Sequence, residues 1–402
     1  MREVVIVGAA RTAIGTFGGS LKEFSATDLG TIVIQEALKR AGVEPEAVDE
    51  VIMGNVLQAG LGENPARQSA VRAGIPVEVP AYTVNKVCGS GLKAVALAAL
   101  SIAAGQSEVV VAGGMESMTN APYLLPRARW GYRMGDEAVV DSMLRDGLLD
   151  AFSHVHMGIT AENLAERFQI SREEQDAFAN ESIRRALAAI EKGCFQEEIV
   201  PIEIPQKKGN PFIFDTDEFP KTRPSPEAMA TFRPAFKKDG TVTAGNASGI
   251  SDGAAAVVVM AKEKAEARGL PPLARIRASA SAGVEPEIMG TGPITAVRKV
   301  LEKAKLSMDD IELIEANEAF AVQALCVARA LKLKPEITNI CGGAVALGHP
   351  IGASGCRILV TLLSNLKRLD RYLGLATLCI GGGQGIAMIV ERERGSHGSG
   401  GF

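Results

Sequence analysis

The chain has 402 residues, and its 43 basic and 47 acidic side chains give a formal net charge of −4, so no basic surface for nucleic acid is expected. Aromatic residues make up only 4%, too few for base-stacking platforms, while a hydrophobic content of 47% argues against intrinsic disorder. Glycine is abundant, with 43 residues, but it follows no three-residue period, so collagen is excluded and a globular protein with many tight turns or close backbone contacts remains.

Short apolar runs alternate with helical patterns in the first part of the chain. The predicted strands are 3–7, 48–53 and 109–112. Residues 28–41 have the apolar spacing of a helix that ends at Gly42, and residues 89–105 are small and apolar throughout, as in a buried helix. Alternating strands and helices predict an α/β fold with a largely buried sheet.

Residues 119–249 interrupt this pattern, because they are richer in proline, aromatic and charged residues. A capping box from Ser171 to Glu174 predicts one helix there, with long irregular segments around it. We therefore expect 119–249 to be a loop domain inserted into an N-terminal α/β half formed by 1–118 and 250–272.

The α/β pattern returns in residues 273–394 and resembles the N-terminal half. Residues 37–52 align with 300–314 at an offset of 263, and residues 89–95 align with 353–359 at an offset of 264. Two matching offsets predict a duplicated fold, with an active site where the two halves meet.

The six cysteines form no C-x-x-C pair and no disulfide pattern. Reduced thiols in a cytoplasmic protein are therefore expected. Residues 1–7 lack the features of a signal peptide, and the apolar stretch 95–104 is too short to cross a membrane. Residues 395–402 are expected to form a flexible tail outside the fold.

Cys88 lies directly before the buried helix, next to glycines at positions 89 and 91. The positive end of the helix dipole should favour its thiolate, and the glycines would let a substrate carbonyl approach backbone N–H groups. A buried structural cysteine is the alternative interpretation.

His349 stands between Gly348 and Pro350, where neither a helix nor a strand would hold it by regular packing. This position suits a general base near neutral pH, and a histidine that only hydrogen-bonds for structure is the alternative. Asn317 follows a predicted strand, at the edge where open α/β sheets bind ligands. It would orient a water or polarise a carbonyl, or else cap the next helix.

A second cysteine, Cys379, precedes the triple glycine 381–383. A tight backbone of this kind offers N–H groups for an oxyanion hole. A dinucleotide-binding loop is the alternative, but the strand-like residues 386–390 follow where that fingerprint needs a helix.

Two further patterns carry less chemistry. Residues 249–253 match G-x-S-x-G around Ser251, but a glycine-rich loop precedes them and a strand-like run follows, which argues against a serine nucleophile. His154 and His156 have no metal-ligand spacing with the cysteines, so no metal site is expected.

Taken together, these motifs resemble the thiolase family closely, over nearly the whole chain. The matching segments are 4–19, 113–118, 240–249 and 375–385. Residues 155–164 look most like the short-chain acetoacetyl-CoA thiolases of that family. The resemblance implies a layered α-β-α-β-α core of two duplicated halves, with an inserted domain that binds CoA and helps to assemble a homotetramer.

The resemblance also implies an acyltransferase reaction with a covalent intermediate. Cys88 attacks acetyl-CoA and becomes acetylated, while His349 takes its proton. Cys379 then removes a proton from a second acetyl-CoA, whose carbanion attacks the acetyl-cysteine and gives acetoacetyl-CoA plus CoA. A degradative 3-ketoacyl-CoA thiolase of β-oxidation, with broader chain length, is the alternative. No cofactor is expected, since CoA is a substrate and product.

Two oxyanion holes follow from the same resemblance. The backbone N–H groups of Cys88 and Gly381 would form one, and His349 with a water held by Asn317 would form the other. The implied CoA-binding residues are His156, Met157, Lys221, Ala244, Ser248, Ala319 and Phe320.

The chain departs from the family pattern at two positions. Lys221 stands where arginine is usual near the CoA nucleotide, and Arg223 would compensate for the lost bidentate geometry. Cys341 replaces an asparagine before two glycines, and we interpret it as structural, with a third reactive thiol, close in sequence to His349, as the alternative. The expected approach of Cys88 and Cys379 would also allow a reversible disulfide.

Overall fold

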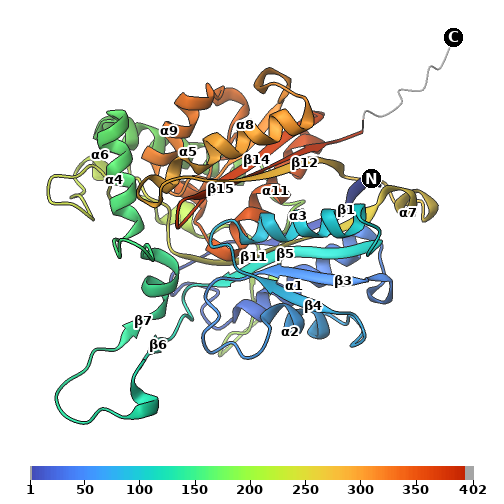
Figure 1. The fold of residues 1–402 in the computed structure, drawn as a ribbon, viewed down its shortest axis with the longest axis horizontal. Helices are drawn as coiled ribbons and strands as arrows, with labels where there is room; N and C mark the ends of the chain where they lie inside the picture. The colour runs from blue at the N-terminus through green and yellow to red at the C-terminus, as the bar shows by residue number, and fades with distance from the viewer. Residues whose placement is uncertain (1, 394–402) are drawn as a thin grey trace.

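Eleven strands form one continuous sheet in residues 2–393, the part of the chain that the computed structural model describes (Figure 1). In sheet order the main strands are β13 (Leu313–Ala316), β14 (Leu373–Ile380), β15 (Gln384–Glu391), β12 (Ala274–Gly283), β1 (Val4–Thr12), β11 (Ser251–Ala261), β5 (Val109–Ser117), β3 (Glu50–Gly54) and β4 (Ala81–Val84). Two short strands, β2 (Gly15–Thr16) and β8 (Ile199–Val200), pair with β11 and β1. The strand predicted at 3–7 is longer than expected, because its pairing with β11 continues to Arg11.

The two halves of the sheet repeat one pattern of pairing. In the N-terminal half, β1–β11 and β11–β5 are antiparallel, whereas β5–β3 and β3–β4 are parallel. In the C-terminal half, β12–β15 and β15–β14 are antiparallel, β14–β13 is parallel, and Ile314 forms a parallel bridge with Thr338 where the fifth strand would lie. This repeat confirms the predicted α/β fold of duplicated halves, while the boundaries at 118/119, 249/250 and 272/273 stay predictions.

Helices lie on both outer faces of the sheet and between its two halves (Figure 1). α1 (Ala26–Ala41) and α2 (Pro65–Arg72) cover the N-terminal half, and α8 (Gly292–Ala304) and α9 (Ala321–Leu331) cover the C-terminal half. α3 (Ser90–Ala103) and α11 (Ile351–Arg368) fill the middle layer. Successive side chains of a strand serve different layers, since Val5 of β1 packs with α1 and Ile6 packs with the middle helices. The layers therefore follow the expected α-β-α-β-α order.

Local sequence explains where these helices begin and end. α1 starts with a capping box between Ser25 and Asp28, and it ends at Gly42, whose φ of 63° is the left-handed conformation predicted for this stop. Two short helices, α7 (Lys262–Ala267) and α10 (Ala344–Leu347), follow β11 and precede α11.

Glycines allow α3 and α11 to cross in close contact. A Cβ at Gly91 would lie 2.8 Å from the backbone nitrogen of Cys356, and a Cβ at Gly355 would lie 2.4 Å from that of Leu92. Any larger residue at either position would push the helices apart. The crossing brings together the N-terminal ends of both helices, and the chain before each carries a candidate catalytic residue.

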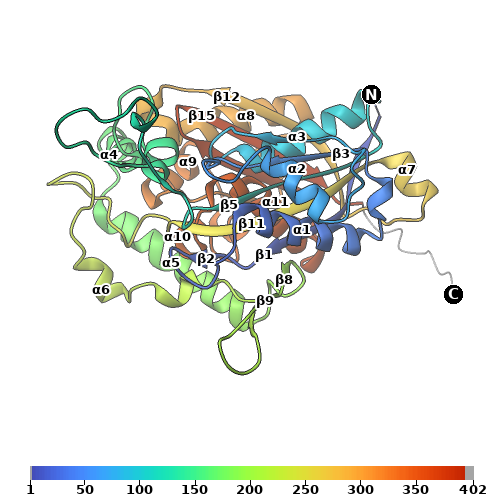
Figure 2. The ribbon, with the colours of Figure 1, turned by 90° about the horizontal axis from the view of Figure 1, so that it is seen from below.

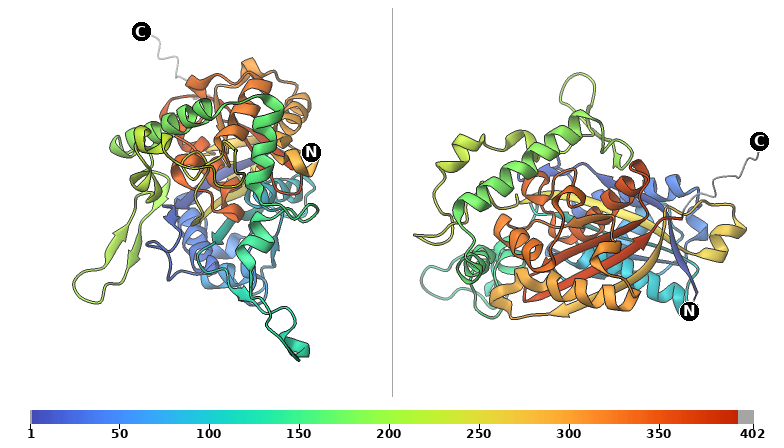
Figure 3. Two further views of the ribbon diagram at one scale, coloured as in Figure 1. Left: turned by 90° about the vertical axis from the view of Figure 1, so that its left-hand side faces the viewer. Right: turned by 90° about the horizontal axis from the view of Figure 1, so that it is seen from above.

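The chain between β5 and β11 lies at one end of the sheet (Figure 1). Its helices are α4 (Met157–Phe168), α5 (Arg172–Glu191), which starts at the predicted capping box, and α6 (Pro226–Ala230). Two hairpin arms protrude from it: β6 (Tyr123–Leu124) with β7 (Val140–Asp141), and β9 (Ile202–Ile204) with β10 (Phe212–Phe214) (Figure 2, Figure 3). Across residues 2–393, the helices are all too short or too polar to cross a membrane.

Candidate active site

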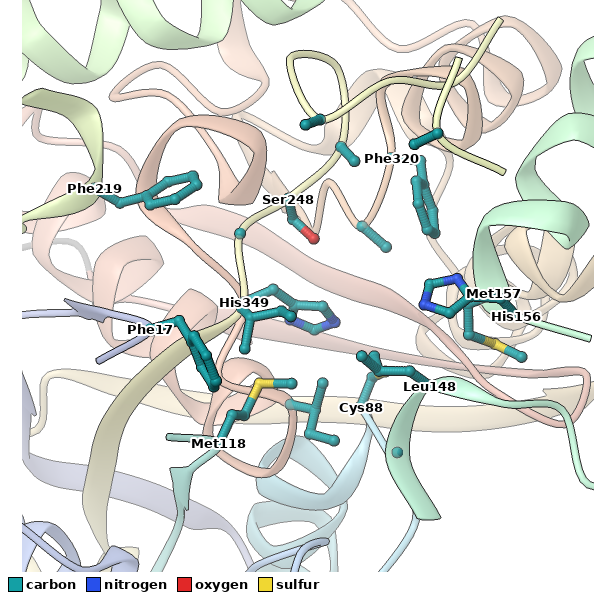
Figure 4. Close-up of a pocket in the computed structure, with 18 of the residues that line it drawn as sticks. Phe17, Cys88, Met118, Leu148, His156, Met157, Phe219, Ser248, Phe320 and His349 are labelled. Carbon is teal, nitrogen blue, oxygen red and sulfur yellow. The ribbon is translucent and has the colours of Figure 1, made fainter. Parts of the chain in front are cut away.

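Four separate segments carry the predicted catalytic residues to one place. Cys88 precedes α3, His349 precedes α11, Cys379 lies in β14 and Asn317 directly follows β13. A cavity of about 760 Å³ is lined by Cys88, His349 and Cys379. Asn317 is not part of the lining but contacts His349. The close-up in Figure 4 shows His349, Cys88 and His156 directed into the same space. The meeting of these residues agrees with the arrangement that the sequence predicted.

The Cys88 thiol is half-buried at the bottom of this cavity. Burial raises its pKa to about 11, although the backbone N–H groups of Gly381 and of Cys88 itself hydrogen-bond the sulfur and act in the opposite direction. The expectation that the helix terminus would favour a resting thiolate is therefore wrong, because the loss of hydration outweighs these donors. The same two N–H groups are those predicted to receive an oxyanion.

His349 is held in one orientation by Ser354, whose hydroxyl lies 2.6 Å from Nδ1. That hydroxyl also donates to the carbonyl oxygen of Pro350 at 2.9 Å, so we assign the imidazole proton to Nδ1, which then donates to Ser354. This tautomer leaves the lone pair on Nε2, which has no partner among the described residues. Burial, assisted by Arg357, lowers the pKa of His349 to about 3, so the imidazole is neutral and able to accept a proton.

Cys379 lies fully buried in β14, opposite Gly385 of β15. Burial raises the pKa of its thiol, and the neighbouring Cys88 raises it further. Two protonated thiols and a neutral imidazole thus share one cavity. A neutral set of this kind offers two thiol protons and one basic nitrogen that can accept a proton during a reaction.

Asn317 approaches the imidazole from β13. Its Nδ2 lies 3.4 Å from Nδ1 of His349, and its Oδ1 has no partner among the described residues. Asn317 is itself buried, so an amide oxygen without a partner is costly unless the site uses it. The geometry suits the predicted role of orienting a small polar molecule.

Six of the seven predicted CoA-binding residues line the cavity. They are His156, Met157, Ala244, Ser248, Ala319 and Phe320. His156 caps the N-terminus of α4 through Nδ1, which accepts the N–H of Gly158 at 3.0 Å, and its ring stacks on Phe236 at 4.6 Å. Most of this wall is apolar, as is common in cavities that bind small molecules.

Lys221 lies outside the cavity lining, exposed on the short helix η4 (Phe219–Thr222) near the cavity mouth. Arg223 does line the cavity, but its guanidinium donates to the carbonyls of Ala244, Gly245 and Ala247 and stacks 4.9 Å from the centre of the Phe219 ring. Burial lowers the pKa of Arg223 to about 10. Arg223 therefore braces a cavity loop, and we correct the view that it would replace Lys221 at the nucleotide.

The remaining sequence candidates lie apart from this chemistry. Ser251 starts β11 and donates its hydroxyl to the carbonyl of Gly249 at 2.9 Å, which is a structural bond. Cys341 is buried, and its pKa is raised to about 12. Within residues 2–393, no three His, Cys, Asp or Glu side chains form a group that could hold a metal ion.

Sequence reasoning missed several residues that shape the site. Ser354 and Glu116 hold the catalytic segments through hydrogen bonds, and Phe236 and Met118 line the cavity. Ser354 was available as a signal, because it lies one helical turn after His349 and aligns with Ser90. Phe236 had no signal, since only the folded chain brings residue 236 to α4.

Comparisons with known proteins agree with this fold and site. Family models of the thiolase N-terminal and C-terminal domains match residues 4–263 and 270–392. Acetyl-CoA acetyltransferases of Pseudomonas aeruginosa and of Escherichia coli strain K12 are each 59% identical over 393 residues, which cover 98% of this chain and 100% of those proteins. The crystal structure of the Bacillus anthracis acetyl-CoA acetyltransferase has a TM-score of 0.95 and 49% identity, and the match covers 97% of this chain and 99% of that one.

The matching family models and relatives define the class of the protein as an acyltransferase, and the duplicated fold with its cysteine-containing cavity agrees with it. Both family models and the relatives span the chain almost from end to end, so the similarity includes every segment that lines the cavity. The chain belongs to the thiolase family.

Proposed function

We propose that the protein is an acetyl-CoA C-acetyltransferase that condenses two molecules of acetyl-CoA to acetoacetyl-CoA and CoA, and that also catalyses the reverse thiolysis. Similarity to acetyl-CoA acetyltransferases over 98% of the chain supports this substrate. The observation that carries the chemistry is the meeting of two thiols, Cys88 and Cys379, with the neutral imidazole of His349 in one cavity.

In the first step the Cys88 sulfur attacks the thioester carbonyl of acetyl-CoA, and His349 takes the thiol proton on Nε2. The tetrahedral oxygen would accept the N–H groups of Cys88 and Gly381, which already face the sulfur. Collapse of this intermediate breaks the bond to CoA, and His349 returns the proton to the leaving CoA sulfur. The product of this step is acetyl-Cys88.

In the second step Cys379 passes its thiol proton to Nε2 of His349, and the resulting thiolate accepts a proton from the methyl group of a second acetyl-CoA. Such a proton is weakly acidic, so the enolate oxygen must be stabilised as it forms, by His349 and a water oriented by Asn317. The carbanion attacks the acetyl carbon, the bond to the Cys88 sulfur breaks to give acetoacetyl-CoA, and the Cys88 sulfur takes back the proton held on Nε2 of His349. CoA is a substrate and product of this scheme, and no other cofactor takes part.

Acetylation provides the first test. Incubation with acetyl-CoA should add one acetyl group, and peptide mass spectrometry should place it on Cys88. The Cys379→Ser variant should still become acetylated but lose condensation. Acetylation at another residue, or full turnover by Cys379→Ser, would refute the assignment of roles.

Chain length decides between this activity and a degradative 3-ketoacyl-CoA thiolase. Met118, Ile351 and Leu148 pack in one apolar cluster with Cys88, and Met157 also lines the cavity. This crowding favours a small acyl group. Thiolysis rates should fall steeply from acetoacetyl-CoA to longer 3-ketoacyl-CoAs. Equal rates up to long chains would reassign the protein to the degradative class.

Assembly and location are part of the same proposal. The β6–β7 arm carries Trp130 and Met134 at 80% and 97% exposure, and we propose that it joins four chains into a homotetramer. Sedimentation equilibrium of the intact chain and of a variant with a shortened arm would test this. The free cysteines of the described residues support a cytoplasmic location.

A further inference from the structure

The duplication gives Cys88 a counterpart in the other half of the fold. Ser90 and Ser354 are aligned, and the glycines that follow them make reciprocal contacts where α3 and α11 cross. Cys88 lies two residues before Ser90. Its counterpart is therefore Gly352, two residues before Ser354.

Strand register extends this correspondence to the other catalytic residues. Glu116 lies two residues beyond the last pairing of β5 with β3, and it faces a glycine of β11. Cys379 lies two residues beyond the last pairing of β14 with β13, and it faces a glycine of β15. Likewise Asn55 and Asn317 are the first residues after β3 and β13. The fold thus contains a second copy of the active-site framework, in which Glu116 takes the place of Cys379.

The carboxylate of Glu116 fills this second framework and is fully buried. Oε2 accepts the N–H of Gly352 at 2.9 Å and that of Val56 at 3.1 Å. Oε1 accepts the N–H of Leu57 at 3.1 Å and the side-chain Nδ2 of Asn55 at 2.7 Å. The N–H of Gly352 corresponds to the N–H of Cys88, which is an oxyanion donor of the active site. In this second framework the N–H of Gly352 donates to the carboxylate of Glu116 instead.

These four bonds join two segments that border the catalytic cavity. Gly352 lies in the first turn of α11, between His349 and its partner Ser354. Val56 and Leu57 pack with Met118 and Ile351 in an apolar cluster next to Cys88. We propose that Glu116 is a positioning residue of the thiolase reaction, which locks the segment carrying His349 to the loop beside Cys88. This inference rests on the proposed function.

The charge of Glu116 also reaches the nucleophile, since it contributes to the raised pKa of Cys88. Burial raises the pKa of Glu116 itself to about 7, while its three backbone donors act in the opposite direction. The titratable groups that act on this carboxylate are Asp252 from β11 and Cys88 from the turn before α3. The loop 55–57 and the first turn of α11 present only N–H and amide donors to it.

The test combines turnover with alkylation of Cys88, which needs no acetyl-CoA. Glu116→Gln should lower kcat by roughly 10–100-fold with little change in KM, as expected for a small displacement of a catalytic group. It should also move the pH midpoint of Cys88 alkylation downwards by roughly half a unit or more, because a nearby negative charge is removed. Glu116→Asp, which keeps the charge, should restore the alkylation midpoint but not the full rate.

Glu198→Gln serves as the matched control, because Glu198 is another buried carboxylate and it pairs with Arg11 and Thr361 away from the cavity. This control should destabilise the fold without moving the alkylation midpoint. An unchanged midpoint and unchanged kcat in folded Glu116→Gln would overturn the inference. If the wild-type protein were not acetylated by acetyl-CoA, the proposed function would be refuted instead. The alkylation experiment would still test Glu116 separately, because it does not use acetyl-CoA.

Discussion

Ser354 and His349 form a hydrogen bond of 2.6 Å that decides which imidazole nitrogen is available for chemistry. The hydroxyl of Ser354 donates its proton to the carbonyl oxygen of Pro350. The serine oxygen therefore accepts from Nδ1 of His349, which leaves Nε2 as the base. The bond spans the start of α11, so the first turns of this helix hold the base that directly precedes it and set its tautomer.

Ser354→Ala should therefore reduce kcat by roughly 10–100-fold with a small effect on KM for acetyl-CoA, because the imidazole loses its orientation but the substrate channel is intact. Steady-state kinetics of folded variants will check this. Ser69→Ala is the matched control, since Ser69 is a buried serine that bonds Thr27 far from the cavity. Equal losses in both variants would show that Ser354 acts only through stability.

The pKa of Cys88 predicts how the free enzyme reacts with alkylating agents. A thiol with a pKa of about 11 is protonated at neutral pH, and His349, with a pKa of about 3, is neutral. Alkylation by iodoacetamide should therefore accelerate about tenfold per pH unit between roughly pH 7 and 10, as the thiolate fraction grows.

Two variants make that measurement specific. Cys194→Ser removes a half-buried thiol that would also react, and Cys88→Ser should abolish the remaining fast reaction. A rate that is already maximal near pH 6 would contradict the neutral pair and indicate a thiolate–imidazolium pair instead.

Replacing Lys221 and replacing Arg223 should change the KM for CoA in different ways. Lys221 is exposed near the cavity mouth, so Lys221→Ala should raise KM for CoA by roughly 2–10-fold, and the effect should shrink at high salt. Arg223 bonds three carbonyls of the 244–247 loop, so Arg223→Ala should lower stability and raise KM independently of salt. A salt-dependent loss at Arg223 and none at Lys221 would reverse the assignment.

The sequence predicted features that depend on neighbours along the chain. The capping box at Ser171, the stop at Gly42 and the positions of Cys88 and His349 before helices all follow from local patterns, and the structure has them. The direction of the Cys88 pKa could not be obtained in this way, because desolvation depends on atoms from distant segments. The hydrogen bonds of the Arg223 guanidinium to the 244–247 loop could not be predicted for the same reason.

The duplication was visible as two offsets, but its consequence for the site was not. Sequence alignment paired Ser90 with Ser354, whereas the correspondence of Glu116 with Cys379 needed strand register. A carboxylate and a thiol share no side-chain pattern, so only the positions of their backbones relate them.

The crossing of α3 and α11 gives the last prediction, which concerns stability. A Cβ at Gly355 would lie 2.4 Å from the backbone nitrogen of Leu92, and two helix backbones cannot both move without displacing Cys88 and His349. Gly355→Ala should cost about 3 kcal/mol or more in the free energy of unfolding, measured by chemical denaturation, at the upper end of ordinary substitutions. Gly283→Ala is the matched control, because its Cβ would meet only one atom, at 3.9 Å, and it should stay within about 0.5 kcal/mol of the wild type. Equal stability of the two variants would mean that the helices can separate, and that close contact at Gly355 does not hold the catalytic segments together.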